Sequence, residues 1–145
     1  MTYPIGSILL IKKYKLPTVE KDKFFIVLDQ EGSDYNLLSI TTSKFDFSDR
    51  LIKHGIINQH SYASVFCFEK DKIIGENGFY FWKNTFISLN NNINKFSFEV
   101  LSQYNIEVKD KLITSELQNL IYCFYRFRGT PKKWKLKLED ILNKI

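Results

Sequence analysis

The stretch KDKFFIVLDQEGSDYNLLSITTSK, residues Lys21 to Lys44, decides the fold. Its uninterrupted apolar run, FFIVL, predicts a strand that is buried on both of its faces. The tetrapeptide EGSD predicts a tight hairpin turn, because glycine beside small polar residues is typical of short connections between strands. YNLLSITTS predicts the returning strand. The stretch therefore specifies an antiparallel pair of strands around which the remaining elements are arranged.

Further strand signals lie on both sides of this hairpin. IGSILLIKKY at 5–14 predicts a first strand, and YASVFCFE at 62–69 and NTFISL at 84–89 predict two later ones. Asn77 and Gly78 form a dipeptide that is typical of tight turns. Strands that follow one another at this spacing favour an antiparallel meander.

The spacing of the apolar residues changes to that of helices towards the C-terminus. KFSFEVL at 95–101 fits a strand and a short helix equally well. The segment 114–127 predicts a helix with Thr114 or Ser115 as its N-cap, and 131–145 predicts a final helix. The buried face of the first of these helices is predicted to consist of Leu117, Leu120, Ile121 and Phe124.

These elements predict an α+β fold in one domain that covers residues 1–145. Residues 1–95 are expected to form mainly β structure, a small antiparallel barrel or a strongly bent sheet. Residues 96–145 are expected to be mainly helical and to end in a helical hairpin. Hydrophobic residues make up 44% of the chain, which is enough for a substantial core.

Composition also limits the classes of function. A net charge of +5 favours a polyanion or an acidic partner. Cys67 and Cys123 are far apart in the sequence, so two reduced thiols are expected. The chain has no recognisable signal peptide and no apolar run long enough to span a membrane, which predicts a cytoplasmic protein.

Motifs for metal-dependent, nucleotide-dependent and serine-nucleophile chemistry are absent from the sequence. His54 and His60 are predicted to be surface residues, and neither a metal nor a cofactor is expected. The groups that remain as candidates for catalysis are amines, guanidinium groups and hydroxyls. They suit cleavage of RNA through its own 2′-hydroxyl, which needs a proton acceptor, a proton donor and cations near the phosphate.

GSILLI at 6–11, KDKFFIVL at 21–28 and YNLLSITTSK at 35–44 resemble the core of the MazF/PemK superfamily of endoribonuclease toxins, most closely its ToxN-like branch. The resemblance implies an SH3-like barrel with added helices and cleavage of single-stranded RNA. It also implies inhibition by an antitoxin, either a small protein or an RNA. The residues that it assigns to contact with RNA or to its cleavage are Lys23, Thr41, Thr42 and Lys44.

Three positions depart from the family pattern: Ser7, Phe24 and Ser39 stand where an acidic residue and two prolines are usual. These departures favour an alternative, a non-catalytic SH3-like module from a mobile element that binds protein or nucleic acid. The EGSD turn supports a site in either case. It brings Lys23 and the end of the following strand towards the same edge of the sheet.

A second basic cluster lies in RFRGTPKKWKLK at 126–137, where cations are interleaved with aromatic residues. The residues predicted to bind RNA here are Arg126, Arg128, Lys132 and Lys133. Trp134 is expected either to stack on bases or to pack in the core. The aromatic run FYFWK at 79–83 is open to the same two interpretations, and the sequence leaves open whether the chain forms a homo-oligomer.

Overall fold

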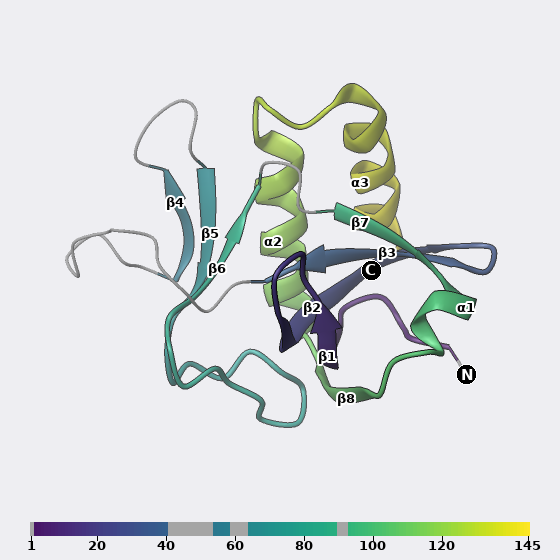
Figure 1. Ribbon diagram of the computed structural model, residues 1–145. Helices are drawn as coiled ribbons and strands as arrows, with labels where there is room; N and C mark the ends of the chain where they lie inside the picture. Colours follow the sequence, from purple (N-terminus) through teal and green to yellow (C-terminus); the bar gives the residue numbers. More distant parts are fainter. Residues whose placement is uncertain (1, 41–53, 59–63, 90–92) are drawn as a thin grey trace.

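The computed structural model describes residues 2–40, 54–58, 64–89 and 93–145 (Figure 1). The strands are β1 (Ser7–Lys15), β2 (Glu20–Glu31), β3 (Asp34–Ser39), β4 (Gly55–Asn58), β5 (Ser64–Phe68), β6 (Thr85–Ser88), β7 (Ile93–Ser97) and β8 (Ile106–Lys111). The helices are α1 (Phe98–Leu101), α2 (Thr114–Arg126) and α3 (Lys132–Lys144). Five strands form an antiparallel sheet in the order β7-β3-β2-β1-β8, and β4, β5 and β6 form a second sheet.

Strand β2 lies at the centre of the larger sheet and is buried on both faces, as its apolar run predicts. Ile26 and Leu28 belong to one apolar core, whereas Phe25 and Val27 belong to another on the opposite face. Neighbouring residues of a strand point to opposite faces, so one run of five apolar residues supplies both cores. Helices α2 and α3 and the smaller sheet cover the first core, and α1 with the N-terminal Tyr3 covers the second.

The hairpin between β2 and β3 is confirmed. Glu31 pairs with Asp34 and Phe25 pairs with Ser39 across the ladder. Gly32 occupies the first central position of the turn with φ +62°, a conformation that costs glycine little and other residues much more.

Of the two alternatives expected for residues 1–95, a small barrel or a strongly bent sheet, the barrel was wrong, because the larger sheet is open. Its edges are β7 and β8, which would have to pair with each other for a barrel to close. Strand β8 was not predicted, because four of its six residues, Glu107 and 109–111, are charged, and Val108, one of its two apolar residues, is 53% exposed. The segment 95–101 proves to be both alternatives in succession, since β7 ends at Ser97 and α1 begins at Phe98.

The pair of C-terminal helices is confirmed, and its predicted apolar face is buried, as the exposures of Leu117, Leu120, Ile121 and Phe124 show. The predicted N-cap was wrong. Ile113 holds that position without a side-chain hydrogen bond, and Thr114 is already helical. Tertiary contact decides this boundary, because the backbone N–H of Ile113 donates to the carbonyl oxygen of Ile74 at 2.9 Å. No helix among the described residues is long and apolar enough to cross a membrane.

The loop at 69–84, between β5 and β6, is held by the carboxylate of Asp110 in β8. Asp110 accepts hydrogen bonds from the backbone N–H groups of Asn77 at 2.9 Å and of Phe79 at 3.1 Å, and from the Asn77 side chain at 3.0 Å. The fit is close, because a Cβ atom on Gly75 would lie 2.2 Å from Asp110 Oδ2. Burial would raise the pKa of Asp110, but the hydrogen bonds from Lys111, Phe79 and Asn77 outweigh it and lower that pKa.

Replacing Asp110 by Asn should lower the free energy of unfolding at neutral pH by about 1–3 kcal/mol, because the loop's N–H donors lose their charged acceptor. The lowered pKa means that the carboxylate stabilises the fold above the ordinary pKa of aspartate. That contribution is lost as the pH falls through the lowered value. Chemical denaturation should therefore show the gap between wild type and Asp110→Asn closing in acid. The exposed Asp140→Asn is the control, and a pH-independent gap would contradict the role of the charge.

Candidate functional site

Lys23 lies near the start of β2, at the point where the neighbouring strand ends. It pairs with Ile11 of β1 on one side. On the other side, the backbone N–H of Ile40 donates to the carbonyl oxygen of Phe24 at 3.1 Å. Ile40 is followed directly in the sequence by Thr41. The described geometry thus brings the chain that leads into the hydroxyl-rich segment to the residue next to Lys23, as the hairpin predicts.

The amine of Lys23 is half-buried and has no ion-pair partner in the part of the chain that the structure describes. Burial lowers the pKa of Lys23 below its ordinary value, and the neighbouring Lys21 ammonium group lowers it further. The contrast with Lys12, one strand away, is clear. Lys12 Nζ lies 3.3 Å from a carboxylate oxygen of Asp22 and 3.9 Å from one of Glu107. Unlike Lys12, Lys23 is therefore available to an anion from outside.

Three of the predicted catalytic residues, Thr41, Thr42 and Lys44, lie outside the described residues. That these three residues lie close to Lys23 is therefore a prediction. It is based on the pairing of Phe25 with Ser39 and on the hydrogen bond from Ile40 to Phe24, which both belong to the described hairpin.

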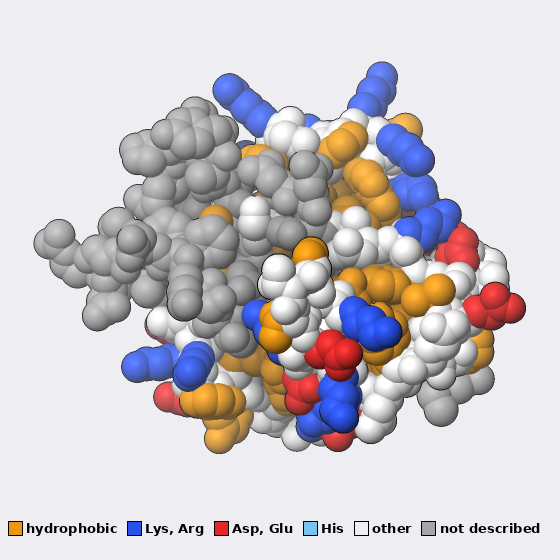
Figure 2. Space-filling view, viewed as in Figure 1, with side chains coloured by type: hydrophobic (Ala, Val, Ile, Leu, Met, Phe, Trp, Pro, Cys, Tyr) orange, Lys and Arg blue, Asp and Glu red, His pale blue; other side chains and the backbone are white. Residues whose placement is uncertain are grey.

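The second predicted cluster surrounds the turn between α2 and α3, and all four of its residues are exposed: Arg126, Arg128, Lys132 and Lys133. Figure 2 shows Lys and Arg side chains projecting at the top of the view, where Figure 1 draws this turn. The turn has a fixed shape, since Thr130 Oγ1 donates to the carbonyl oxygen of Phe124 at 2.7 Å. The guanidinium carbon of Arg126 lies 5.6 Å from the ring centroid of Tyr122, which is half exposed.

Trp134, beside this cluster, is engaged within the protein. It is partly buried, and Lys137 Nζ lies 4.9 Å from its ring centroid. Lys137 in turn forms an ion pair with Glu31 at the end of β2, and Lys95 approaches the same carboxylate at 3.4 Å. Hydrogen bonding to Lys137 is the main reason that the pKa of Glu31 falls to about 2. These contacts attach α3 to the sheet, so Trp134 has a structural role.

Lys23 and the basic residues around the α2–α3 turn lie on different parts of the fold. In Figure 1 the α2–α3 turn lies at the top of the view, whereas β1 and β2 lie lower, at the height of the lower half of α2. An RNA chain that touched both would have to run along the molecule.

His54 is not the surface residue that the sequence predicts. Its Nε2 lies 2.6 Å from Glu116 Oε1, and the backbone N–H of Glu69 donates to its Nδ1 at 3.1 Å. Because Nδ1 accepts, the ring proton is on Nε2 and points at Glu116. The other predicted surface histidine, His60, lies outside the described residues. No group of three or more His, Cys, Asp or Glu side chains in the described ranges is placed to hold a metal ion.

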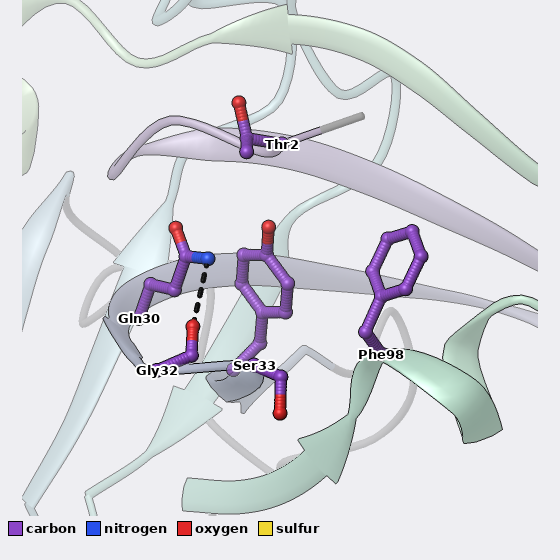
Figure 3. Close-up of a pocket in the computed structure, with 6 residues that line it drawn as sticks. Thr2, Gln30, Gly32, Ser33 and Phe98 are labelled. Carbon is purple, nitrogen blue, oxygen red and sulfur yellow. Dashed lines mark hydrogen bonds between the residues drawn. The ribbon is translucent and has the colours of Figure 1, made fainter.

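A pocket of about 340 Å³ lies at the tip of the β2–β3 hairpin (Figure 3). Its lining consists of Thr2, Gln30, Gly32, Ser33, Tyr35 and Phe98. None of these side chains carries a charge at neutral pH. The Tyr35 hydroxyl accepts a hydrogen bond from the backbone N–H of Tyr3 at 3.2 Å. The pocket contains none of the sequence-predicted site residues, and its lining offers hydroxyls but no cation that could balance the charge of a phosphate.

Replacing Lys23 by Met should leave the protein as stable as wild type at neutral pH or raise its free energy of unfolding by up to about 1 kcal/mol, since a half-buried unpaired amine is removed. A lowered pKa means that the unfolded chain binds the proton more tightly. Wild-type stability should therefore rise relative to Lys23→Met as the pH approaches the ordinary value of 10.5. Thermal unfolding across this pH range measures both effects. Lys12→Met, which breaks ion pairs, should be neutral or destabilising, and a marked loss of stability in Lys23→Met would show a structural role for Lys23.

No protein-family model matches the chain, and neither the curated proteins nor the solved structures yield a significant match.

Proposed function

We propose that the protein is a metal-independent endoribonuclease of the toxin–antitoxin type, which cleaves single-stranded RNA in the cytoplasm. The observation that carries the proposal is the half-buried position of the Lys23 amine and the lack of a described carboxylate beside it. A half-buried amine with a lowered pKa and no described carboxylate partner costs stability and is suited to contact a phosphate. The neighbouring Phe24 accepts a hydrogen bond from Ile40, the residue before Thr41, so we expect the hydroxyls that such a site needs to follow close to Lys23.

In the proposed reaction the 2′-hydroxyl of one nucleotide gives up its proton to solvent water and its oxygen attacks the adjacent phosphorus, and the bond to the 5′-oxygen of the next nucleotide breaks. The products are a 2′,3′-cyclic phosphate and a 5′-hydroxyl. Lys23 stabilises the extra negative charge of the phosphorane and donates a proton to the leaving 5′-oxygen, which a lowered pKa makes easier. Thr41 and Thr42 position the phosphate, and Lys44 adds a second positive charge.

The four exposed cations at the α2–α3 turn extend the proposal to the rest of the RNA. Arg126 and its neighbours have no described ion-pair partners, so they are available to phosphates that lie outside the site of cleavage. An active RNase would damage the RNA of its own cell. The expected partner is therefore an inhibitor, either a small protein or an RNA, that covers one of these two surfaces.

Purified protein should cleave single-stranded RNA in the presence of EDTA. Lys23→Ala, Thr41→Ala and Lys44→Ala should each lower the rate by about 10²- to 10⁴-fold, the usual contribution of a group that transfers a proton or stabilises charge. Lys23→Arg should recover little of the rate, since an arginine keeps the charge but holds its proton too tightly to donate it.

The matched control is Lys144→Ala, which removes the same charge from an exposed position near the end of α3. It should cleave RNA at the wild-type rate. If the wild-type protein bound RNA but did not cleave it, the result would contradict the nuclease proposal and favour the non-catalytic binding module.

Binding of a non-cleavable single strand should weaken with salt, and the cations of the α2–α3 turn should account for part of that dependence. Arg126→Ala or Lys133→Ala should each reduce the slope of log K against log salt by about 0.7, the value for one phosphate contact with a single strand. Fluorescence anisotropy at several salt concentrations measures this. An unchanged slope in both variants would show that RNA does not contact the turn.

A further inference from the structure

Strand β1 contains a β-bulge opposite the start of β2. Ile11 of β1 pairs with Lys23 of β2. The next pair is Tyr14 with Lys21, so three steps along β1 match two steps along β2. In a regular strand Tyr14, three residues after Ile11, would lie on the opposite face of the sheet. The extra residue reverses the alternation and places Tyr14 on the same face as Ile11 and Lys23.

The bulge is held by a carboxylate and carries backbone strain. Lys13 has φ +50°, a left-handed conformation that is uncommon for lysine. Its backbone N–H donates to Asp22 Oδ1 at 3.0 Å, and Lys12 Nζ donates to Asp22 Oδ2 at 3.3 Å. The hydrogen bond from Lys13 is the main reason that the pKa of Asp22 is lowered. Bulges are common beside active sites, where they redirect a side chain.

The ring of Tyr14 is fixed by three aromatic neighbours. Its centroid lies 5.3 Å from that of Phe25, 5.7 Å from that of Tyr104 and 6.2 Å from that of Phe96. All four rings belong to the second core or pack against it. The hydroxyl group of Tyr14, by contrast, makes no hydrogen bond within the described part of the chain. A phenol held in this way can donate to a bound molecule with little loss of side-chain entropy.

The Tyr14 phenol and the Lys23 amine are neighbours on this face. Lys23 lies between Lys21, which is the strand partner of Tyr14, and Phe25, whose ring packs against that of Tyr14. The side chain of Tyr14 therefore passes beside Lys23. Neither Lys21 nor Lys23 has an ion-pair partner among the described residues. The acid between them, Asp22, points to the opposite face, where it holds the bulge.

The polar groups on this face are all donors. Burial and the neighbouring Tyr104 raise the pKa of Tyr14, so its hydroxyl group keeps its proton at neutral pH. Lys21 and Lys23 add two amines, of which the first is exposed and the second is half-buried. Two amines and a protonated phenol suit a ligand that carries negative charge and accepts several hydrogen bonds. A phosphate group has both properties.

We infer that Tyr14 is a further catalytic residue of the candidate site, whose hydroxyl group donates a hydrogen bond to the phosphate that Lys23 contacts. The identity of this phosphate as part of a single-stranded RNA rests on the proposed function. The hydrogen bond from Tyr14 adds to the stabilisation of the negative charge on the phosphorane. Lys21, which is exposed on the same face, contacts the next phosphate of the strand.

Binding of a strand that cannot be cleaved tests this contact without relying on catalysis. The probe is a single-stranded 2′-deoxy oligonucleotide of about ten nucleotides. Tyr14→Phe keeps the aromatic contacts and removes only the hydroxyl group. It should weaken binding by about 10-fold or more, the effect of one hydrogen bond to a charged group. The slope of log K against log salt should not change, whereas Lys21→Ala should reduce it by about 0.7.

The matched control is Tyr80→Phe, which removes the same hydroxyl group from an exposed tyrosine in the loop at 69–84. It should bind the oligonucleotide as wild type does. In wild-type protein labelled with 13C at the tyrosine Cζ atoms, the Tyr14 signal should shift on binding. In cleavage of RNA, Tyr14→Phe should lower kcat/KM by about 10- to 150-fold, with the thermal midpoint of wild type.

Two results would overturn the inference, whether or not the protein cleaves RNA. One is wild-type affinity for the oligonucleotide in Tyr14→Phe. The other is an unshifted Tyr14 signal in wild-type protein saturated with the oligonucleotide, which decides the matter even if Tyr14→Phe folds poorly. A failure of the proposed function alone would look different. Tyr14 would then contribute to binding of the oligonucleotide, and RNA would remain intact.

Discussion

Burial of β2 on both faces is the constraint on which the rest of the structure depends. The side chains of Phe25 and Val27 fill one core while those of Ile26 and Leu28 fill the other, and all four are essentially inaccessible to solvent. A strand with two apolar faces must be covered on both. Helices α2 and α3 and the smaller sheet satisfy one side, and α1 with the N-terminal residues satisfies the other. Each face then has its own cover, and the sheet remains open.

The same constraint accounts for the state of Lys23. The strand leaves the apolar region through Phe24, whose ring packs against Phe81 of the loop at 69–84. The next residue towards the N-terminus, Lys23, points to the opposite face, where its strand partner Ile11 belongs to the second core, so it is half-buried although it is a lysine. An amine in that position is desolvated, which lowers its pKa. A half-buried amine without a described carboxylate partner is suited to bind an anion, and this supports the proposed contact with phosphate.

Local sequence patterns predicted the elements whose contacts are local. The β2–β3 hairpin follows from its glycine turn, and the buried face of α2 follows from the spacing of Leu117, Leu120, Ile121 and Phe124. Strand β8 could not be predicted from its own sequence, because this segment forms a strand through its pairing with β1, which is distant in the sequence. The N-cap of α2 was misplaced for the same reason, since Ile74 fixes Ile113 from outside the helix.

In the candidate site, too, the features that depend on local contacts could be predicted and those that depend on distant contacts could not. The placement of Lys23 beside the end of β3 could be predicted from one hairpin. The lowered pKa of its amine could not, because it requires the packing around β2. The run FYFWK at 79–83 is rich in aromatic residues, but the sequence does not show which of their rings face outwards. That choice depends on Asp110, which holds Asn77 and Phe79 from a strand more than thirty residues away.

The ends of the RNA fragments test the central claim most directly. Single-stranded RNA incubated with wild-type protein in EDTA should yield 2′,3′-cyclic phosphate and 5′-hydroxyl ends. A substrate with one 2′-deoxy nucleotide at the cleaved position should resist at that position alone. Intact RNA, or fragments that carry 5′-phosphate ends, would contradict cleavage through the 2′-hydroxyl and with it the proposed role of Lys23.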